Sequence, residues 1–213
     1  MRDEAHEASV LARTEHFRGR VWAVASDEVR LPSGDVTVRD VVVHPGAVGV
    51  AAVDDAGRIL LIRQFRHPVG GYLIELPAGL RDVPDEPPLQ TARRELAEEA
   101  GITAGEWYVL VDFFNSPGGS TEAFRCYLAR DLSPLPGGRP HTGEAEEADL
   151  PQVWVPIDEA VEAVLAGDLH NPTTVTGVLA VAAARDRNWR TLRPASEPMW
   201  SLPPGGPASA YGA

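Results

Sequence analysis

The chain has 213 residues, 44% of them hydrophobic, and a net charge of −12, which allows one substantial core and a small accessory unit. The negative charge argues against nucleic acid as a partner, and no apolar run approaches the length that spans a bilayer. Because residues 1–9, MRDEAHEAS, lack the apolar centre of a signal peptide, we expect a cytoplasmic protein without membrane contact. The single cysteine, Cys126, can form no internal disulfide and is expected to be a buried neutral thiol.

The N-terminal part of the chain predicts a β-ribbon. The first sixteen residues are polar and charged and indicate no element. Segments 20–31 and 36–44 have strand-like patterns and are separated by Pro, Ser, Gly and Asp, which predicts a hairpin. Because two strands alone are marginally stable in water, we expect this ribbon, assigned to residues 1–44, to lean on the main domain or on a second subunit.

The middle of the chain predicts the centre of a sheet. Segments 47–53 and 59–66 are nearly continuous apolar strands, separated by the turn-forming residues 54–57. Segments 107–114 and 121–129 predict two further strands joined by a loop rich in turn formers.

Two helices are predicted after the last strand. The first begins at residue 157 and ends near Gly167. The second begins at Asn171, an expected N-cap that a proline follows, and runs to about Arg187. The order of strands, helix, strands and helices predicts an α/β domain over residues 45–193, with a mixed sheet sandwiched by helices. Residues 194–213 are rich in Pro, Gly, Ser and Ala and predict a flexible tail.

An acidic helix stands out between the predicted strands. Four apolar residues recur at helical spacing: Leu89, Ala92, Leu96 and Ala100. Three glutamates fall within an arc of about 100° beside that stripe: Glu95, Glu98 and Glu99. One interpretation is a solvated acidic face, which is what most charge runs are. The other is a set of carboxylate ligands for a divalent cation.

The context of this helix favours the second interpretation. Residues 79–102, GLRDVPDEPPLQTARRELAEEAGI, resemble the Nudix box, and the segment that starts at Arg94 matches the end of the motif throughout. Six residues separate Gly79 from Glu86, one more than in the common pattern. The resemblance implies a Nudix α/β/α sandwich with a mixed sheet, to which the N-terminal ribbon is added. It also implies that Gly79 and Gly101 have structural roles and that Glu86 and Arg94 form an ion pair.

The resemblance further implies a metal site. Its ligands would be the carboxylates of Glu95, Glu98 and Glu99 and the backbone carbonyl of Ala78, and the metal would be Mg²⁺, for which Mn²⁺ is a possible substitute. Hard cations with oxygen ligands suit phosphoanhydride hydrolysis, because they neutralise the phosphates and lower the pKa of bound water. A metal would also let a chain of net charge −12 bind an anionic substrate.

A catalytic base is expected on a late loop. In relatives that hydrolyse ADP-ribose, a glutamate of such a loop orients the water, and the segment GEAEEADL occupies that place here. Glu147 and Glu146 are the candidates, with Glu144 behind them, and the sequence does not choose among them.

Features outside the box resemble the ADP-ribose pyrophosphatase branch of the family. They are RQFR at 63–66, ELPAG at 75–79, and SPGGSTE, whose proline comes sixteen residues after Gly101. The resemblance suggests four substrate-binding residues: Trp22 for the adenine ring, Arg39 and Arg66 for phosphate or ribose, and Glu122 for the terminal ribose. Phe17 is a weaker candidate for the base. The resemblance also implies a homodimer that forms through the N-terminal ribbon.

The expected function is Mg²⁺-dependent hydrolysis of ADP-ribose to AMP and ribose 5-phosphate. A different nucleoside diphosphate derivative, such as a sugar nucleotide or a dinucleotide, is an alternative within the same chemistry. A non-catalytic ADP-ribose sensor is an alternative from another class, although the residues outside the Nudix portion are few and acidic for a DNA-binding module. An isomerase on the same scaffold would be expected to place a cysteine near the site, and Cys126 is the one cysteine of the sequence.

Overall fold

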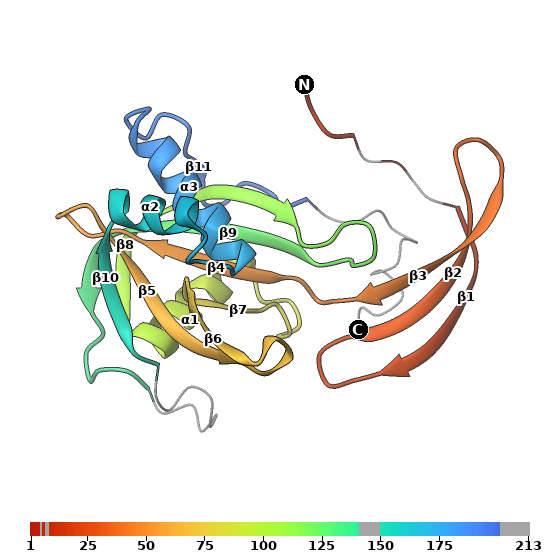
Figure 1. Cartoon of the computed structure of the whole chain (residues 1–213), viewed down its shortest axis with the longest axis horizontal. Coiled ribbons are helices and arrows are strands. Elements are labelled where there is room, and N and C mark those ends of the chain that lie inside the picture. The colour runs from red at the N-terminus through yellow and green to blue at the C-terminus, as the bar shows by residue number, and fades with distance from the viewer. Residues whose placement is uncertain (5, 7–8, 141–149, 201–213) are drawn as a thin grey trace.

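The computed structural model describes residues 1–4, 6, 9–140 and 150–200, and Figure 1 shows their arrangement. The strands are β1 (Ser9–Arg18), β2 (Ala23–Arg30), β3 (Val36–Val43), β4 (Ala47–Ala52), β5 (Arg58–Arg66), β6 (Gly71–Glu75), β7 (Ala78–Leu80), β8 (Ile102–Phe114), β9 (Ala123–Pro134), β10 (Gln152–Pro156) and β11 (Arg193–Pro194). The helices are α1 (Pro88–Ala100), α2 (Ile157–Ala166), α3 (Pro172–Arg185) and the short 3₁₀ helix η1 (His67–Val69).

The N-terminal sheet has three antiparallel strands in the order β1-β2-β3. The predicted hairpin is confirmed by the antiparallel pairing of β2 with β3. The prediction missed β1, which pairs with β2 from Ser9 to Arg18. Most side chains of β1 are exposed on both faces, so its sequence carries no hydrophobic alternation. Backbone pairing holds the strand instead, together with Arg13, whose Nη2 donates to Oδ2 of the buried Asp27 at 2.7 Å.

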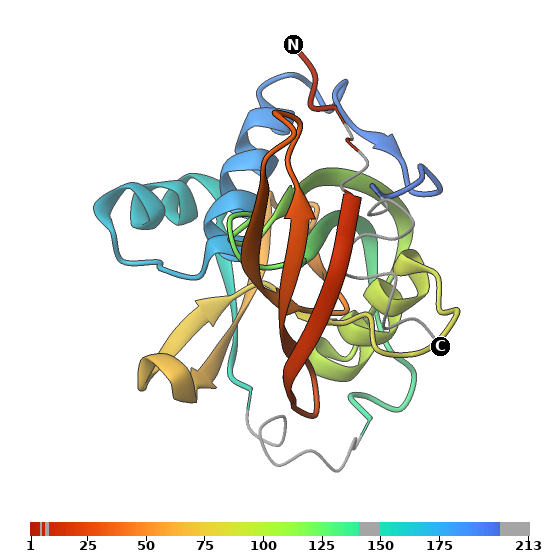
Figure 2. The same cartoon turned by 90° about the vertical axis from the view of Figure 1, so that its right-hand side faces the viewer.

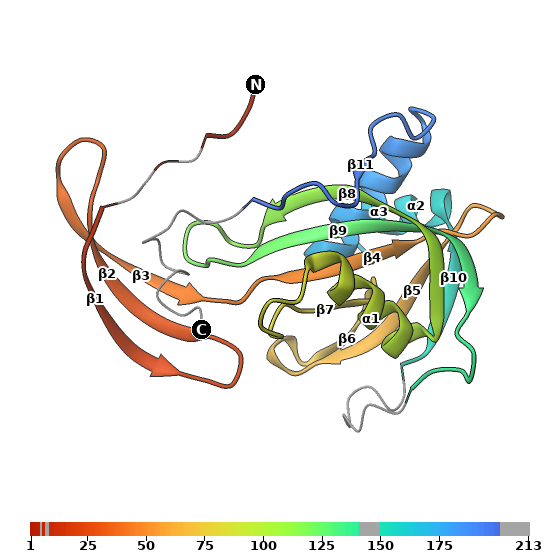
Figure 3. The same cartoon turned by 180° about the vertical axis from the view of Figure 1, so that it is seen from behind.

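This sheet projects from one end of the molecule, as Figures 1 and 3 show. Its base is attached to the loop between β8 and β9. The backbone N–H of Val42 donates to the carbonyl of Gly119 at 2.8 Å, and the N–H of Thr121 donates to the carbonyl of Val42 at 3.0 Å. The hydroxyl of Thr121 accepts from the N–H of His44 at 2.9 Å. These bonds anchor the ribbon at the point where the chain enters the main domain.

The main domain contains a five-stranded sheet, β11-β8-β9-β4-β7, and a three-stranded sheet, β10-β5-β6. The pair β4–β9 is parallel and the pair β8–β9 is antiparallel, so the larger sheet is mixed, as predicted. Helices α2 and α3 lie on one side of the strands and α1 lies on the other, which Figure 2 shows end-on. The prediction of an α/β/α sandwich with an N-terminal β-subdomain is confirmed.

Alternation along the central strands divides the core into two clusters. In β4, Ala47 and Ala51 belong to the cluster that includes residues of α2 and α3, whereas Val48 and Val50 belong to the cluster that includes residues of α1. A strand whose two faces are both buried reads as a continuous apolar run, which is why this part of the sheet was predictable.

The segment after α3 returns to the sheet. Strand β11 pairs with β8, and the buried guanidinium of Arg125 donates to the carbonyls of Glu197 at 2.6 Å and Pro198 at 3.2 Å. The ring of Trp200 contacts the ring of Phe114, with centroids 5.8 Å apart. Composition predicted a flexible tail from residue 194, but up to Trp200 the chain packs on the domain. Among the described helices, none has both the length and the apolar character needed to cross a membrane.

Candidate active site

Helix α1 begins and ends where local signals place it. Pro88 occupies the first turn after Pro87, a position where a missing N–H costs nothing. At the other end Gly101 adopts a left-handed conformation with φ 67°, and its N–H donates to the carbonyl of Ala97 at 2.9 Å. The helix therefore presents its glutamates from a rigid element with well-defined ends.

Two of these glutamates are buried at the edge of the packed face. Glu95 is 6% exposed and Glu99 is 3% exposed. Oε2 of Glu99 accepts a hydrogen bond from the backbone N–H of Ala78 at 2.8 Å, which ties α1 to β7. An added Cβ on Gly79 would lie 2.0 Å from the carboxylate of Glu95, so a side chain at this position would displace that carboxylate. This close approach explains why the motif has a glycine at position 79.

Arg94 links three glutamates. Its Nε and Nη2 lie 3.3 Å from the two carboxylate oxygens of Glu86, while Nη1 donates to Glu95 at 2.7 Å and to Glu98 at 3.0 Å. The hydrogen bonds from Arg94 outweigh desolvation and lower the pKa of Glu86. The expected ion pair between Glu86 and Arg94 is present, and the same guanidinium also positions two of the expected metal ligands.

The donor set suits a hard divalent cation, because three carboxylates project from little more than one helical turn and all donors are oxygens. In this structure the three do not converge on one point, since Arg94 binds Glu95 and Glu98 while Ala78 binds Glu99. Within the described ranges, no three His, Cys, Asp or Glu side chains group closely enough to hold a metal ion. Arg94 thus orients two of the three carboxylates, and the N–H of Ala78 orients the third.

Arg66 lies on the same face of the sheets as α1. Its Nε and Nη2 donate to the two carboxylate oxygens of Glu75 at 2.9 and 2.7 Å. Glu75 is buried, whereas the Arg66 side chain is 40% exposed, so the guanidinium still presents a face to solvent. The pleat puts Arg66, Glu75 and the buried Leu60 on one side of the strands, and Leu60 packs in the α1 cluster. Sequence reasoning missed Glu75, although it belongs to the ELPAG segment.

Trp22 lines a pocket of about 720 Å³ between the ribbon and the main domain. The walls are the β1–β2 turn at 18–23, the end of β3 at 43–45 and residues 80–88, which we call the box loop. Trp22 is 43% exposed and its ring lies 6.1 Å from that of Phe17. The structure thus brings the aromatic residue expected for the base to the loop that precedes α1.

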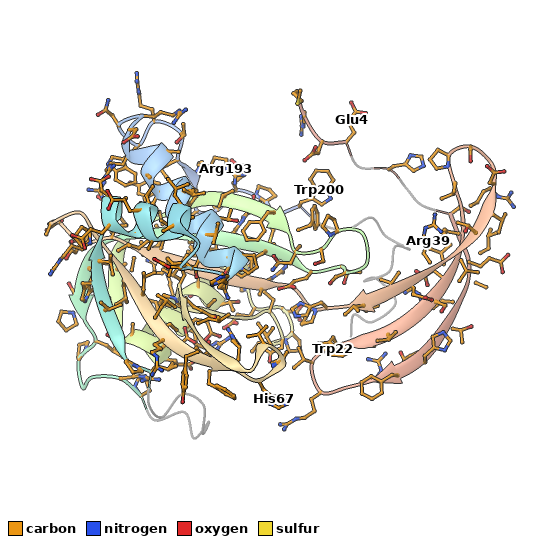
Figure 4. All side chains as sticks on the ribbon, viewed as in Figure 1. Glu4, Trp22, Arg39, His67, Arg193 and Trp200 are labelled. Atoms are coloured by element: carbon orange, nitrogen blue, oxygen red, sulfur yellow. The ribbon has the colours of Figure 1, made fainter. Side chains whose placement is uncertain are left out.

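Arg39 and Glu122 lie outside the lining of this pocket. Arg39 projects from β3, with Nη1 donating to the Thr37 hydroxyl and the Val38 carbonyl, both at 3.1 Å, and Figure 4 shows it on the ribbon away from Trp22. Glu122 accepts from the Asn115 side-chain amide at 3.0 Å. Burial lowers the pKa of His44, and the nearby Glu122 carboxylate opposes this shift.

The expected catalytic bases, Glu147, Glu146 and Glu144, lie outside the described residues. Cys126 is fully buried in the cluster under α2 and α3, and burial raises the pKa of its thiol to about 12. It therefore sits on the opposite side of the sheet from α1 and serves as a small apolar residue, which removes the feature an isomerase would need.

Comparisons with known proteins agree with this geometry. The sequence model of the NUDIX domain matches residues 43–174. The chain is 46% identical over 178 residues to an ADP-ribose pyrophosphatase of Mycobacterium tuberculosis, covering 84% of each protein. It is 35% identical over 173 residues to an ADP-ribose pyrophosphatase of Bacillus subtilis, covering 81% of this chain and 91% of that one. A crystal structure of an ADP compounds hydrolase superposes with a TM-score of 0.72 at 23% identity, covering 88% of this chain and 100% of the other, and shows the shared fold.

Proposed function

We propose, since this chain belongs to the Nudix family, that it hydrolyses the diphosphate of ADP-ribose to AMP and ribose 5-phosphate. The observation that carries the proposal is the pair of buried carboxylates, Glu95 and Glu99, held one helical turn apart at the edge of the sheet. Burying two carboxylates so close together is costly even though Arg94 binds Glu95 and the N–H of Ala78 binds Glu99, so their burial argues for a functional role. The similarity to two proteins named ADP-ribose pyrophosphatase supports the choice of substrate.

Nudix hydrolases generally use a divalent metal, and we propose Mg²⁺, with Mn²⁺ as a possible substitute. Glu95, Glu98 and Glu99, with the carbonyl of Ala78, would hold it. The cation supplies charge neutralisation of the diphosphate and activation of water. Arg94 holds Glu95 and Glu98, the N–H of Ala78 holds Glu99, and Gly79 leaves the space in which Glu95 lies.

The remaining substrate contacts follow the same logic. Arg66 keeps its guanidinium fork oriented through Glu75 and can bind a phosphate oxygen with its exposed edge. We propose that Trp22 contacts the adenine, that Arg39 and Glu122 contact phosphate or ribose, and that Glu147 or Glu146 orients the attacking water. Arg39 and Glu122 do not line the pocket that holds Trp22, so the proposal for these two residues requires that a second subunit complete the site.

We also propose that the chain forms a homodimer through its N-terminal sheet. Val36 and Val38 alternate on one face of β3 and are 46% and 59% exposed. An exposed apolar pair on a projecting sheet favours a partner surface. Light scattering on wild type and on Val38→Glu tests this: we expect a dimer that the charge converts to monomer, and a monomeric wild type at micromolar concentration contradicts it.

The function is tested by incubating the protein with ADP-ribose and Mg²⁺ in ¹⁸O-labelled water. We expect AMP and ribose 5-phosphate in equal amounts, with the label in one of the two phosphates, which identifies the phosphorus that water attacks. Binding of ADP-ribose without release of AMP at saturating Mg²⁺ would instead indicate a sensor. Faster hydrolysis of a sugar nucleotide or a dinucleotide in a substrate panel would move the assignment to another nucleoside diphosphate derivative.

A further inference from the structure

Arg81 carries a positive charge, and its described neighbours offer its guanidinium no strong hydrogen-bond acceptor. It lies in the box loop and lines the 720 Å³ pocket, where its side chain is half-buried. Its Nε is buried and has no hydrogen-bond partner among the described residues. Its Nη1 contacts the sulfur of Met199 at 3.7 Å, and a thioether is a weak acceptor.

No carboxylate among the described residues pairs with this guanidinium. Desolvation lowers the pKa of Arg81; Tyr127 opposes this shift, and the nearby positive charge of Arg125 adds to it. A half-buried cation without an anion is unfavourable, because burial removes water without supplying a counter-charge. The surroundings of Arg81 therefore suit an anionic group that arrives from the pocket.

The rest of the pocket indicates which anion fits. Trp22 offers an exposed aromatic face, and Arg20 adds a second guanidinium to the lining. Asp82 and Asp85 also line the pocket, and their carboxylates can accept hydrogen bonds from sugar hydroxyls. An aromatic surface, guanidinium groups and hydroxyl acceptors in one cavity match a base, a phosphate and a ribose.

We propose that Arg81 binds the phosphate of a nucleotide in this pocket, with Trp22 against the base. Turning the guanidinium toward the pocket forfeits only the contact with Met199 and gives Nε–H an acceptor. The inference rests on the proposed function, since it places the AMP half of the substrate, and it makes Arg81 a determinant of affinity for the phosphorylated nucleoside.

The test compares AMP, adenosine and inorganic phosphate by isothermal titration calorimetry on the full chain without divalent metal. Arg81→Leu should weaken AMP binding about tenfold or more, as expected for losing a hydrogen-bonded charge, and leave adenosine binding unchanged. Trp22→Ala should weaken AMP and adenosine alike and leave inorganic phosphate unchanged. Arg190→Leu is the matched control, because Arg190 is an exposed arginine outside the pocket lining and should bind AMP as wild type does.

Arg81→Lys covers the possibility that the leucine variant folds poorly. It keeps the charge but loses the planar fork, so an intermediate loss of AMP affinity is expected. AMP binding by both Arg81 variants at wild-type affinity overturns the inference. If wild type hydrolyses ADP-ribose while these variants bind AMP normally, the proposed function stands and the role of Arg81 fails. If wild type fails to hydrolyse ADP-ribose but AMP binding depends on Arg81, the role of Arg81 stands and the proposed function fails.

Discussion

The carboxylate of Glu95 occupies the space that a side chain at Gly79 would fill, with a distance of 2.0 Å to an added Cβ. The observed position of Glu95 in α1 therefore depends on a glycine in β7, sixteen positions earlier in the sequence. A side chain at residue 79 would force the Glu95 carboxylate to move, and that movement would disturb its 2.7 Å contact with Arg94.

Gly79→Ala is therefore expected to displace Glu95 and to lower kcat about 100-fold, the cost of misplacing a catalytic group by about 1 Å. The measurement is steady-state hydrolysis of ADP-ribose with Mg²⁺, together with a thermal unfolding curve. Gly118→Ala is the control, since an added Cβ there meets nothing within 4 Å. Wild-type kcat in Gly79→Ala would show that the position of Glu95 does not matter for turnover.

Glu99→Gln is expected to remove most turnover, about 100-fold or more, while the protein stays folded. Glutamine keeps an oxygen that can accept from the N–H of Ala78, so the contact between α1 and β7 survives. The loss of turnover would therefore result from the missing negative charge and not from a change in the fold. Titration of activity against Mg²⁺ checks it, and Glu162→Gln on the exposed side of α2 should behave as wild type. Full activity of Glu99→Gln at saturating Mg²⁺ argues against metal ligation by this residue.

Arg94→Lys is expected to lower activity about tenfold, in the range seen when a group that orients metal ligands is replaced. In this structure the guanidinium of Arg94 contacts Glu86, Glu95 and Glu98 at the same time. The single ammonium group of a lysine cannot make all of these contacts. Arg93→Lys is a closely matched control, because the neighbouring residue is exposed and its guanidinium lies over the ring of Trp107. Equal loss in both variants would point to helix stability and not to the three-way link.

The Asp112–Arg125 pair makes the stability of the fold depend on pH. Burial alone would raise the pKa of Asp112, but hydrogen bonds from Arg125 and Arg193 outweigh it and hold this pKa below its ordinary value. Because the folded pKa lies below the unfolded pKa of about 3.9, the stabilisation is complete above that pH and is lost as pH falls through the folded pKa.

Asp112→Asn should thus lower the free energy of unfolding at pH 7 by about 3 kcal/mol, because it leaves the buried Arg125 without its carboxylate. Urea unfolding at pH 7 and at pH 3 checks this, and the difference from wild type should shrink at the lower pH. Asp158→Asn, which breaks an exposed pair with Arg185, should leave the unfolding curve nearly unchanged. A difference between wild type and Asp112→Asn that is the same at both pH values would contradict the assigned shift.

Local patterns in the sequence determined the elements that depend on neighbouring residues. The extent of α1 follows from its apolar stripe and from Gly101, and the start of α3 follows from Asn171, whose side-chain oxygen accepts from two backbone N–H groups at 2.9 and 3.1 Å. The central strands were predictable because strands buried on both faces are apolar throughout. The motif then placed three glutamates on one side of a helix, which is a property of helical spacing alone.

Only the tertiary structure decided the features that join distant segments. Strand β1 and residues 194–200 carry polar or proline-rich sequences, and they are ordered by pairing with β2 and by the carbonyl contacts of Arg125, neither of which leaves a periodic pattern. The ion pair of Arg66 with Glu75, and the buried Nε of Arg81 that has no partner among the described residues, are likewise invisible in sequence, because a charged side chain reads the same whether or not it has a partner. Burial and proximity give such residues their chemistry, and both arise only when strands and loops from different parts of the chain are packed together.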